Sequence, residues 1–267
     1  MAILTLSRKV GSGSEEIGRQ VARTLRYRFV DKFEIMAEMR AMGEEWEKTG
    51  ETFDERYPNF WDRRGSSFIG YVALVQWIIL NFAAKGNAVI ISRGSNFLLK
   101  GVPYAYRVRV TAPLEQRIER IMSREGVTHD VAEMLVEKGD HEMSRSIQYN
   151  YGKDWDDPAE YDAVVDTGTG TIDQITDNLI EELSRRDNIR TRDMRKALFL
   201  RARAYEIRAR ILTDPKLSVP LLDVRPDGQE LVLKGVVENT SMADRIETLA
   251  RRVAGDIALK IDIQSRR

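Results

Sequence analysis

Strand-like runs alternate with segments of helical periodicity through the first two thirds of the chain. Ile17, Val21 and Leu25 recur at i, i+4 and i+8, as on the buried face of a helix. Further helices are predicted at 113–124 and 171–185. The strand-like runs lie at residues 2–7, 88–92, 107–112 and 161–166. Strands separated by helices predict an α/β fold whose parallel sheet has helices on both faces.

The last third of the chain follows a different pattern. A basic helix is predicted first, and a tight-turn signal, Pro226-Asp-Gly228, then separates two strand runs. The predicted elements are a helix at 192–212, strands at 221–225 and 230–237, a helix at 241–254 and a strand at 258–263. This αββαβ order is sufficient for a small α+β domain.

The most apolar stretch covers residues 68–84 and contains Gln76 and Asn81. A stretch of this length and polarity predicts a buried helix rather than a membrane span. The first seven residues lack the charged start and apolar run of a signal peptide. We therefore expect a cytoplasmic protein.

The composition of the chain excludes several kinds of chemical site. The 267 residues include 42 Lys plus Arg and 42 Asp plus Glu, and no Cys. Disulfides and thiolate metal sites are thereby excluded. His129 and His141 are the only histidines, which leaves little for a histidine zinc site or a Ser-His-Asp triad, so no metal site is predicted from the residues.

Charge is unevenly distributed along the chain. Residues 190–267 hold 17 Lys/Arg and 11 Asp/Glu, whereas the preceding residues are negative by the same margin. Such a shift indicates a domain boundary. The predicted parts are an α/β domain at 1–188, a basic helical linker at 189–213 and a small domain at 214–267.

A glycine-rich turn, Gly11-Ser-Gly-Ser14, follows the first strand and opens the first helix. Backbone N–H groups and the helix dipole at such a place favour an anion. Gly11 and Gly13 permit a tight turn and close backbone approach. The alternative interpretation is a plain helix start with Ser14 as the N-cap.

Several further motifs occur in order with this turn. They are Ile3-Leu-Thr-Leu-Ser-Arg8, Ile17-Gly18, Phe29-Val-Asp31-Lys32, Val89-Ile-Ile-Ser-Arg-Gly94, Asp154-Trp-Asp-Asp-Pro158 and Tyr161-Asp-Ala-Val-Val-Asp-Thr167. In this set the chain resembles the cytidylate-kinase-like family of P-loop nucleoside monophosphate kinases, over about residues 1–185. The resemblance implies a doubly wound P-loop fold, ATP with Mg²⁺ as phosphoryl donor, and a nucleoside monophosphate such as CMP or dCMP as acceptor.

The resemblance also implies site residues. Gly11, Ser12, Gly13 and Ser14 would hold the nucleotide phosphates. Arg93 would hold the acceptor phosphate, since a guanidinium suits that dianion. Asp31 would lie on the acceptor side. The alternative interpretations are a surface arginine at a strand end for Arg93 and a helix N-cap for Asp31.

The chain departs from the family pattern where cations are expected. Ser14 occupies the position of the lysine in a full Walker loop, and Glu15 and Glu16 follow it. The branch of the family that the chain resembles usually lacks this lysine too, often with an arginine beside the loop, and here that neighbour is Glu15. In the lid, Asp140 is kept, but Met143 and Gln148 stand at cation positions. Phosphoryl transfer depends on positioned cations, so a substitute is needed for activity. The candidates are Arg8, Lys9, Arg19, Arg120, Arg124 and Arg145, with Arg145 or Arg120 expected as the lid cation.

Two regions allow more than one interpretation. Trp155 either stacks on a base or packs the lid against the body. The C-terminal part contains a set of spaced motifs: Asp214-Pro-Lys-Leu217, Gly228, Val232-Leu-Lys-Gly-Val236, Ala243, Ile246, Ala250, Val253-Ala-Gly255 and Ile261. In this spacing, residues 195–265 resemble a BON domain, a small module named from osmotically induced and nodulation proteins. This resemblance implies an anionic membrane or a protein as partner, and the basic helix at 190–210 fits a membrane, nucleic acid or a plain solvated linker. Nucleic acid is the least favoured, because few aromatics accompany the basic residues.

Three hypotheses follow for the whole chain. It is an active nucleoside monophosphate kinase, a catalytically inactive sensor that still binds nucleotide, or an adaptor that acts through its C-terminal part.

Overall fold

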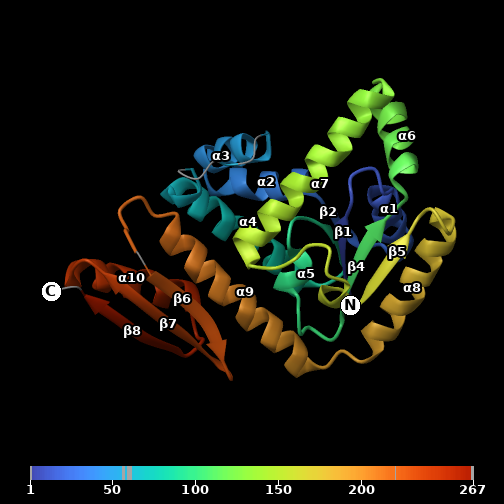
Figure 1. Cartoon of the computed structure of the whole chain (residues 1–267). Coiled ribbons are helices and arrows are strands. Elements are labelled where there is room, and N and C mark those ends of the chain that lie inside the picture. The colour runs from blue at the N-terminus through green and yellow to red at the C-terminus, as the bar shows by residue number, and fades with distance from the viewer. Residues whose placement is uncertain (1, 56–57, 59–61, 220, 266–267) are drawn as a thin grey trace. The chain divides into compact units, whose positions relative to one another are not determined.

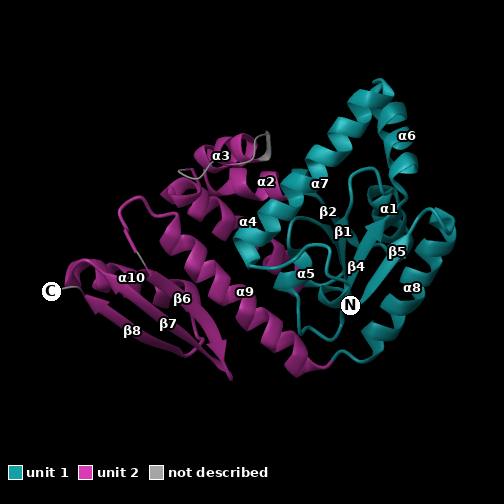
Figure 2. Ribbon diagram, in the orientation of Figure 1, with its two compact units in different colours: residues 1–34, 85–190 teal, residues 35–84, 191–267 magenta. Residues whose placement is uncertain are grey.

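The computed structural model describes residues 2–55, 58, 62–219 and 221–265. Their contacts define two compact units (Figure 2). The first comprises Met1–Glu34 with Lys85–Arg190, and the second comprises Ile35–Ala84 with Thr191–Arg267. Residues 35–84 thus group with the C-terminal segment, whereas the sequence pattern assigned them to the first domain. The predicted domain boundaries after residues 188 and 213 stay predictions.

The first unit is built on a five-stranded parallel sheet (Figure 1) with the strand order β2-β3-β1-β4-β5. Its strands are β1 (Ile3–Arg8), β2 (Arg28–Val30), β3 (Ala88–Ile91), β4 (Ala105–Thr111) and β5 (Ala163–Asp166). The order confirms the predicted α/β fold with a parallel sheet. The strand β2 was missed, because three residues with an exposed Arg28 give no readable apolar pattern.

The two faces of this sheet differ in polarity. On one face, Leu4 and Leu6 of β1 pack with the side chains of α1 (Ser14–Leu25) and α8 (Ile172–Asn188) in one buried cluster. On the other face, Thr5 and Ser7 are buried polar residues, and Ser7 lies beside Arg109 of β4. The apolar face follows from the alternation of side chains along a strand. This face also carries the buried apolar residues Ile3 and Ile90, so its polar residues gather toward the carboxyl end of β1, where open α/β sheets bind ligands.

Two helices follow β4 and form a hairpin (Figure 1). They are α6 (Leu114–Glu125) and α7 (His129–Tyr151), and Ile118, Ile121 and Val136 belong to the buried cluster between them. Gly126, with φ of +68°, ends α6 in the left-handed conformation that glycine adopts without strain. The short helices α5 (Ser95–Leu98) and η2 (Pro158–Glu160) complete the unit.

The helical part of the second unit contains the apolar stretch noted in the sequence. It forms α4 (Ser66–Lys85), preceded by α2 (Lys32–Met42), α3 (Glu44–Glu55) and η1 (Asp62–Arg64). By length and composition α4 could cross a membrane, and 56% of its most apolar window is buried inside the protein. Within α4, Ile78 and Phe82 are buried and Trp77 is half-buried.

The C-terminal part of the second unit has the predicted αββαβ order. It runs through α9 (Arg192–Leu212), β6 (Leu221–Asp227), β7 (Glu230–Val237), α10 (Thr240–Ala254) and β8 (Leu259–Ser265). The strand β7 pairs antiparallel with β6 and parallel with β8. Leu200 and Ile207 of α9, Ile246 of α10, and Leu231 and Leu233 of β7 share one buried core.

Candidate functional site

The turn between β1 and α1 requires glycine at two positions. Gly11 and Gly13 have φ of +75° and +78°, the left-handed region that disfavours other residues. A Cβ atom on Gly11 would lie 2.6 Å from the carbonyl oxygen of Arg117. The N–H of Ser12 donates to the carbonyl of Lys9 at 3.1 Å, so the chain folds back on itself here.

The start of α1 is free of a side-chain cap. Gly13 is the N-cap residue and, in the described part of the chain, supplies no side-chain cap, so the alternative interpretation with Ser14 as N-cap is wrong. The first N–H groups of a helix have no partner within the helix. The Ser12 hydroxyl nearby is buried and has no hydrogen-bond partner in the described structure. Both features suit a bound anion.

Three side chains from distant parts of the sequence hold the carbonyl groups of the turn. Arg117 donates to Val10 O at 3.2 Å and Arg120 to Gly11 O at 3.2 Å, and the hydroxyl of Thr167 donates to Ser12 O at 3.0 Å. Three consecutive carbonyl oxygens are thereby engaged by α6 and by the loop after β5. Because these carbonyl oxygens accept hydrogen bonds, they repel an anion in the turn less than unbonded carbonyls would.

Asp140 on α7 also anchors the turn. Its carboxylate accepts from the N–H of Val10 at 2.9 Å and from Arg117 at 2.7 Å. The resemblance predicted Asp140 as a lid aspartate, and its observed role is to join α7, α6 and the turn. Gly139 allows the close approach, because a Cβ atom there would lie 2.7 Å from a methyl group of Val10.

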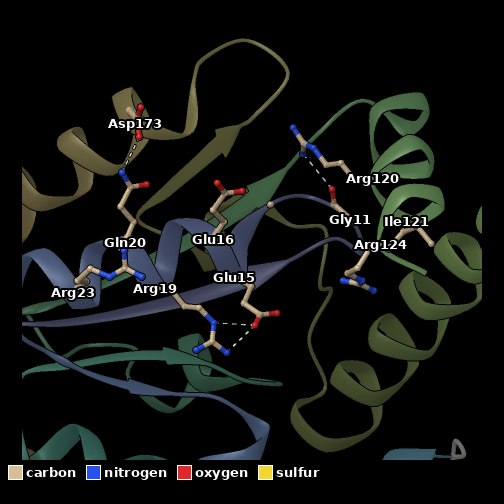
Figure 3. Close-up of a pocket in the computed structure, with 11 residues that line it drawn as sticks. Gly11, Glu15, Glu16, Arg19, Gln20, Arg23, Arg120, Ile121, Arg124 and Asp173 are labelled. Carbon is tan, nitrogen blue, oxygen red and sulfur yellow. Dashed lines mark hydrogen bonds and ion pairs between the residues drawn. The ribbon is translucent and has the colours of Figure 1, made fainter. Parts of the chain in front are cut away.

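The acidic residues that follow the turn point away from it. Arg19 donates to Glu15 through Nε at 3.0 Å and through a terminal nitrogen at 2.8 Å, and it also pairs with Asp31 at 3.2 Å. Figure 3 shows Glu15 directed along α1 toward Arg19 and Glu16 projecting to the other side of the helix. Both carboxylates line the pocket beside the turn, and Arg19 offsets the charge of Glu15.

A pocket of about 710 Å³ lies beside the turn (Figure 3). Its lining includes Gly11 and Gly13, the residues Glu15, Glu16, Arg19 and Arg23 of α1, and Arg120 and Arg124 of α6. Asp173, at the start of α8, also lines it. Of the predicted site residues, this lining contains Gly11, Gly13 and Arg120 and the candidate cations Arg19 and Arg124, but not Ser12, Ser14, Arg93 or Arg145.

Three predicted residues lie elsewhere in the first unit. Asp31 accepts from the N–H groups of Phe33 at 2.9 Å and Glu34 at 3.1 Å, so it caps α2 as the alternative interpretation expected. Arg93 follows β3, and its carbonyl accepts from the hydroxyl of Tyr151 at 3.4 Å. Arg145 is exposed on α7. Their proposed contacts with substrate stay predictions.

A buried polar network at the ends of β1 and β4 was missed by the sequence analysis. The side chain of Arg109, 3% exposed, forms an ion pair with Asp156 and donates to Tyr161 at 3.2 Å and to the carbonyl of Trp155. The indole N–H of Trp155 donates to Ser7 at 2.9 Å. Trp155 is 2% exposed, so packing rather than base stacking is its role. The signal was an arginine inside a strand run, since charged residues are almost never fully buried unless they are paired.

The turn fits the phosphates of a nucleotide better than the neighbouring acids fit a metal ion. The orphaned hydroxyl of Ser12 and the uncapped start of α1 supply donors for phosphate oxygens. The described residues contain no group of three or more His, Cys, Asp or Glu that could hold a metal. Magnesium commonly uses one or two carboxylates together with substrate phosphates. Glu15, Glu16 and Asp173 line the pocket, and Asp31 lies nearby; Glu15 and Asp31 are paired with Arg19, and Asp173 accepts from Gln20.

Comparison with known proteins agrees with this geometry. A profile of the Cytidylate kinase-like family matches residues 3–169. A cytidylate kinase of Methanocaldococcus jannaschii is 29% identical over 180 residues, which cover 65% of this chain and 92% of that enzyme. A cytidylate kinase of Pyrococcus furiosus is 27% identical over 177 residues, covering 65% and 83%.

Two other similarities are more limited. A uronate isomerase of Corynebacterium glutamicum is 30% identical over 108 residues, and the match spans 39% of this chain and 20% of the isomerase. The crystal structure of an uncharacterized protein from Eubacterium ventriosum superposes with a TM-score of 0.55 at 17% identity, covering 69% of this chain and 99% of that protein. The structural match shows a shared fold.

Proposed function

The chain belongs to the Cytidylate kinase-like family, and on that premise we propose that it binds a nucleoside triphosphate at Gly11–Ser14 and transfers its terminal phosphoryl group to a nucleoside monophosphate. CMP and dCMP are the proposed acceptors. The supporting observation is the open, uncapped turn, with its carbonyls held by Arg117, Arg120 and Thr167.

The residues of the turn would act by position and charge. The N–H groups at the start of α1 and the hydroxyl of Ser12 would hold phosphate oxygens, and the helix dipole favours their negative charge. Arg120 lines the same pocket and would lie beside the bound nucleotide. Magnesium, when bound, would neutralise charge on the phosphates. Phosphoryl transfer needs little else from the protein than such positioning.

An ADP-release assay tests the catalytic part of this proposal. Purified protein with ATP and Mg²⁺ is assayed against CMP, dCMP, UMP and AMP, with Gly11→Ala as the inactive comparison and Gly228→Ala as the matched control. Gly228 also has a positive φ, of +60°, but a Cβ atom there would meet nothing within 4 Å. Turnover with a cytidine monophosphate that is lost only in Gly11→Ala supports the proposal. No turnover above background with any acceptor contradicts it.

The second candidate is a sensor that binds nucleotide without transferring phosphate. The observation in its favour is the replacement of the loop lysine by Ser14, followed by a Glu15 that is neutralised by Arg19. Thermal unfolding with and without saturating ATP and Mg²⁺ separates the cases, because a ligand that binds the folded state raises the melting temperature. A rise without turnover indicates the sensor, and no rise contradicts both candidates.

The C-terminal αββαβ module is proposed to be BON-like and to bring a cytoplasmic enzyme to an anionic membrane or a protein partner. Arg192, Arg195 and Lys196 are exposed on the first turns of α9 and are the residues to test. Co-sedimentation of the full chain with phosphatidylserine vesicles is expected at low salt and should weaken at high salt. Equal sedimentation of a triple glutamine variant would show that these residues do not contribute.

A further inference from the structure

The turn lacks the ammonium group expected at position 14, so another cation has to serve the phosphates. Arg117 and Arg120 are tied to backbone carbonyls and to Asp140 or Thr167 at 2.7 to 3.2 Å. Arg19 is bound by Glu15 at 2.8 Å. Withdrawing Arg117 or Arg120 would break hydrogen bonds that hold the turn, whereas Arg19 and Arg124, whose pairs with Glu15 and Glu125 are exposed, are competing candidates in the pocket.

Lys9 is held more loosely. Its ammonium nitrogen lies 3.4 Å from Oδ1 of Asp156, longer than a normal hydrogen bond between an ammonium and a carboxylate. It also lies 5.9 Å from the ring centroid of Trp155. The side chains of Lys9 and Asp156 are 28% and 55% exposed. An ion pair exposed to this extent contributes little, typically about 0 to 1 kcal/mol, so its ammonium can leave at small cost.

The backbone of Lys9 is fixed at the mouth of the turn. Its N–H donates to Val110 O at 3.1 Å, and its carbonyl accepts from Ser12 N at 3.1 Å. The second bond closes a four-residue turn, so the Cα atoms of Lys9 and Ser12 lie within about 7 Å of each other. A lysine side chain is long and flexible, so its ammonium can reach an anion held by Ser12 and the start of α1.

Asp156 does not depend on Lys9 for its charge partner. The same oxygen, Oδ1, accepts from the buried Arg109, which is held in turn by Tyr161 at 3.2 Å and lies 4.2 Å from the ring centroid of Trp155. When Lys9 leaves, the Asp156 carboxylate therefore remains paired. The network of Arg109, Asp156 and Trp155 can therefore hold the Lys9 ammonium while no phosphate is bound.

We propose that Lys9 replaces the missing loop lysine by moving from Asp156 to the terminal phosphates of the bound nucleotide. This inference rests on the proposed function, because it needs a triphosphate in the turn. It adds that the phosphate-binding cation comes from the start of the turn, and that Asp156 competes with the phosphates for it.

Binding of ATP with Mg²⁺, and of inorganic tripolyphosphate, measured by titration calorimetry on the full chain, tests the proposal. Lys9→Met should weaken both by about 10- to 100-fold, the range for a lost hydrogen bond to a charged group, while Lys9→Arg should retain most of the affinity. The matched control is Lys153→Met, which removes another half-exposed lysine, one that pairs with Glu160 at 2.9 Å, and should leave binding unchanged. Circular dichroism and thermal unfolding establish that each variant is folded.

The outcomes separate this inference from the proposed function. If the unaltered protein binds neither ligand, the proposed function fails and the inference with it. If the unaltered protein binds but Lys9→Met binds within twofold of it, the inference alone is overturned.

A second variant tests the competition. Asp156→Asn keeps an acceptor for Arg109 but removes the negative charge that retains Lys9, so it should strengthen tripolyphosphate binding by a few fold. The same change in a Lys9→Met background should have no effect. An equal gain in both backgrounds would contradict the role of Asp156 as the resting partner.

Discussion

Arginine side chains have different partners in the two units. In the first unit, Arg117 and Arg120 donate to backbone carbonyls of the turn before α1. Along α9 of the second unit, Arg203 pairs with Glu206 on the same helix at 2.7 Å, and Arg208 donates to an amide side chain of α4 at 3.1 Å. The sequence marks α9 as the basic region, yet the arginines that shape a candidate site lie in the acidic part of the chain.

The difference shows that partner and burial, rather than local charge density, decide what an arginine contributes. An arginine that satisfies buried carbonyls is costly to remove, because those groups lose their donors. A half-exposed arginine paired along a helix contributes only tenths of a kcal/mol. Matched substitutions in the two units test this contrast.

The largest effect is expected at Arg109. Arg109→Met should lower the free energy of unfolding by about 3 kcal/mol, because the buried carbonyl of Trp155 and the buried hydroxyl of Tyr161 lose a donor. Arg203→Met in α9 is the control, with an expected loss of about 0.5 kcal/mol. Urea denaturation followed by circular dichroism measures both. Equal losses in the two variants would abolish the proposed contrast between the units.

The next effect concerns two glycines with positive φ. Gly11→Ala should cost about 3 kcal/mol, because the left-handed backbone costs about 1 to 2 kcal/mol and the new methyl group meets the carbonyl of Arg117 at 2.6 Å. Gly228→Ala carries the backbone cost alone. The same denaturation experiment compares them. A Gly11→Ala variant as stable as Gly228→Ala would show that the turn relaxes easily, against the tight anchoring described here.

Much of the fold was predictable because apolar periodicity reports burial directly. The alternation of strands and helices and the αββαβ order of the last third were both confirmed. The position of the turn was also predictable, since Gly11 and Gly13 mark positive φ angles. The strand β2 was not, because its three residues take their place from β3 rather than from a pattern of their own.

The surroundings of the turn could not be predicted from local pattern. Arg117 lies 107 residues from its partner Val10, and Thr167 lies 155 residues from Ser12. The spacing of residues in a local motif carries no information about contacts between residues so far apart in the sequence. The family resemblance did direct attention to Asp140, but only the structure shows that it holds the turn.

A smaller effect is expected at Glu160, a buried carboxylate that accepts from Lys100 at 2.7 Å and Lys153 at 2.9 Å. The hydrogen bond from Lys100, then that from Lys153, lowers the pKa of Glu160. A lowered folded-state pKa contributes stability above the unfolded value of about 4.3, and this is lost as the pH falls through the folded pKa. Glu160→Gln should cost about 1 kcal/mol at pH 7, because both lysines are half exposed and regain water. Unfolding curves between pH 7 and 3 should converge for the two proteins, and a constant gap would contradict the assignment.

The smallest effect is expected at His129, which tests whether exposure or membership of the first unit sets the size of a contribution. Its hydrogen bond with Glu115, 2.9 Å long, raises the pKa of this exposed imidazole. A raised folded-state pKa contributes stability that is complete below the unfolded value of about 6.5 and is lost as the pH rises through the folded pKa. Thermal unfolding of His129→Gln and the unaltered protein should therefore differ slightly at pH 6 and not at pH 9, by less than the Glu160→Gln difference at pH 7. A large difference at pH 6 would mean that exposed pairs of the first unit also contribute strongly, and burial would then no longer explain the contrast with α9.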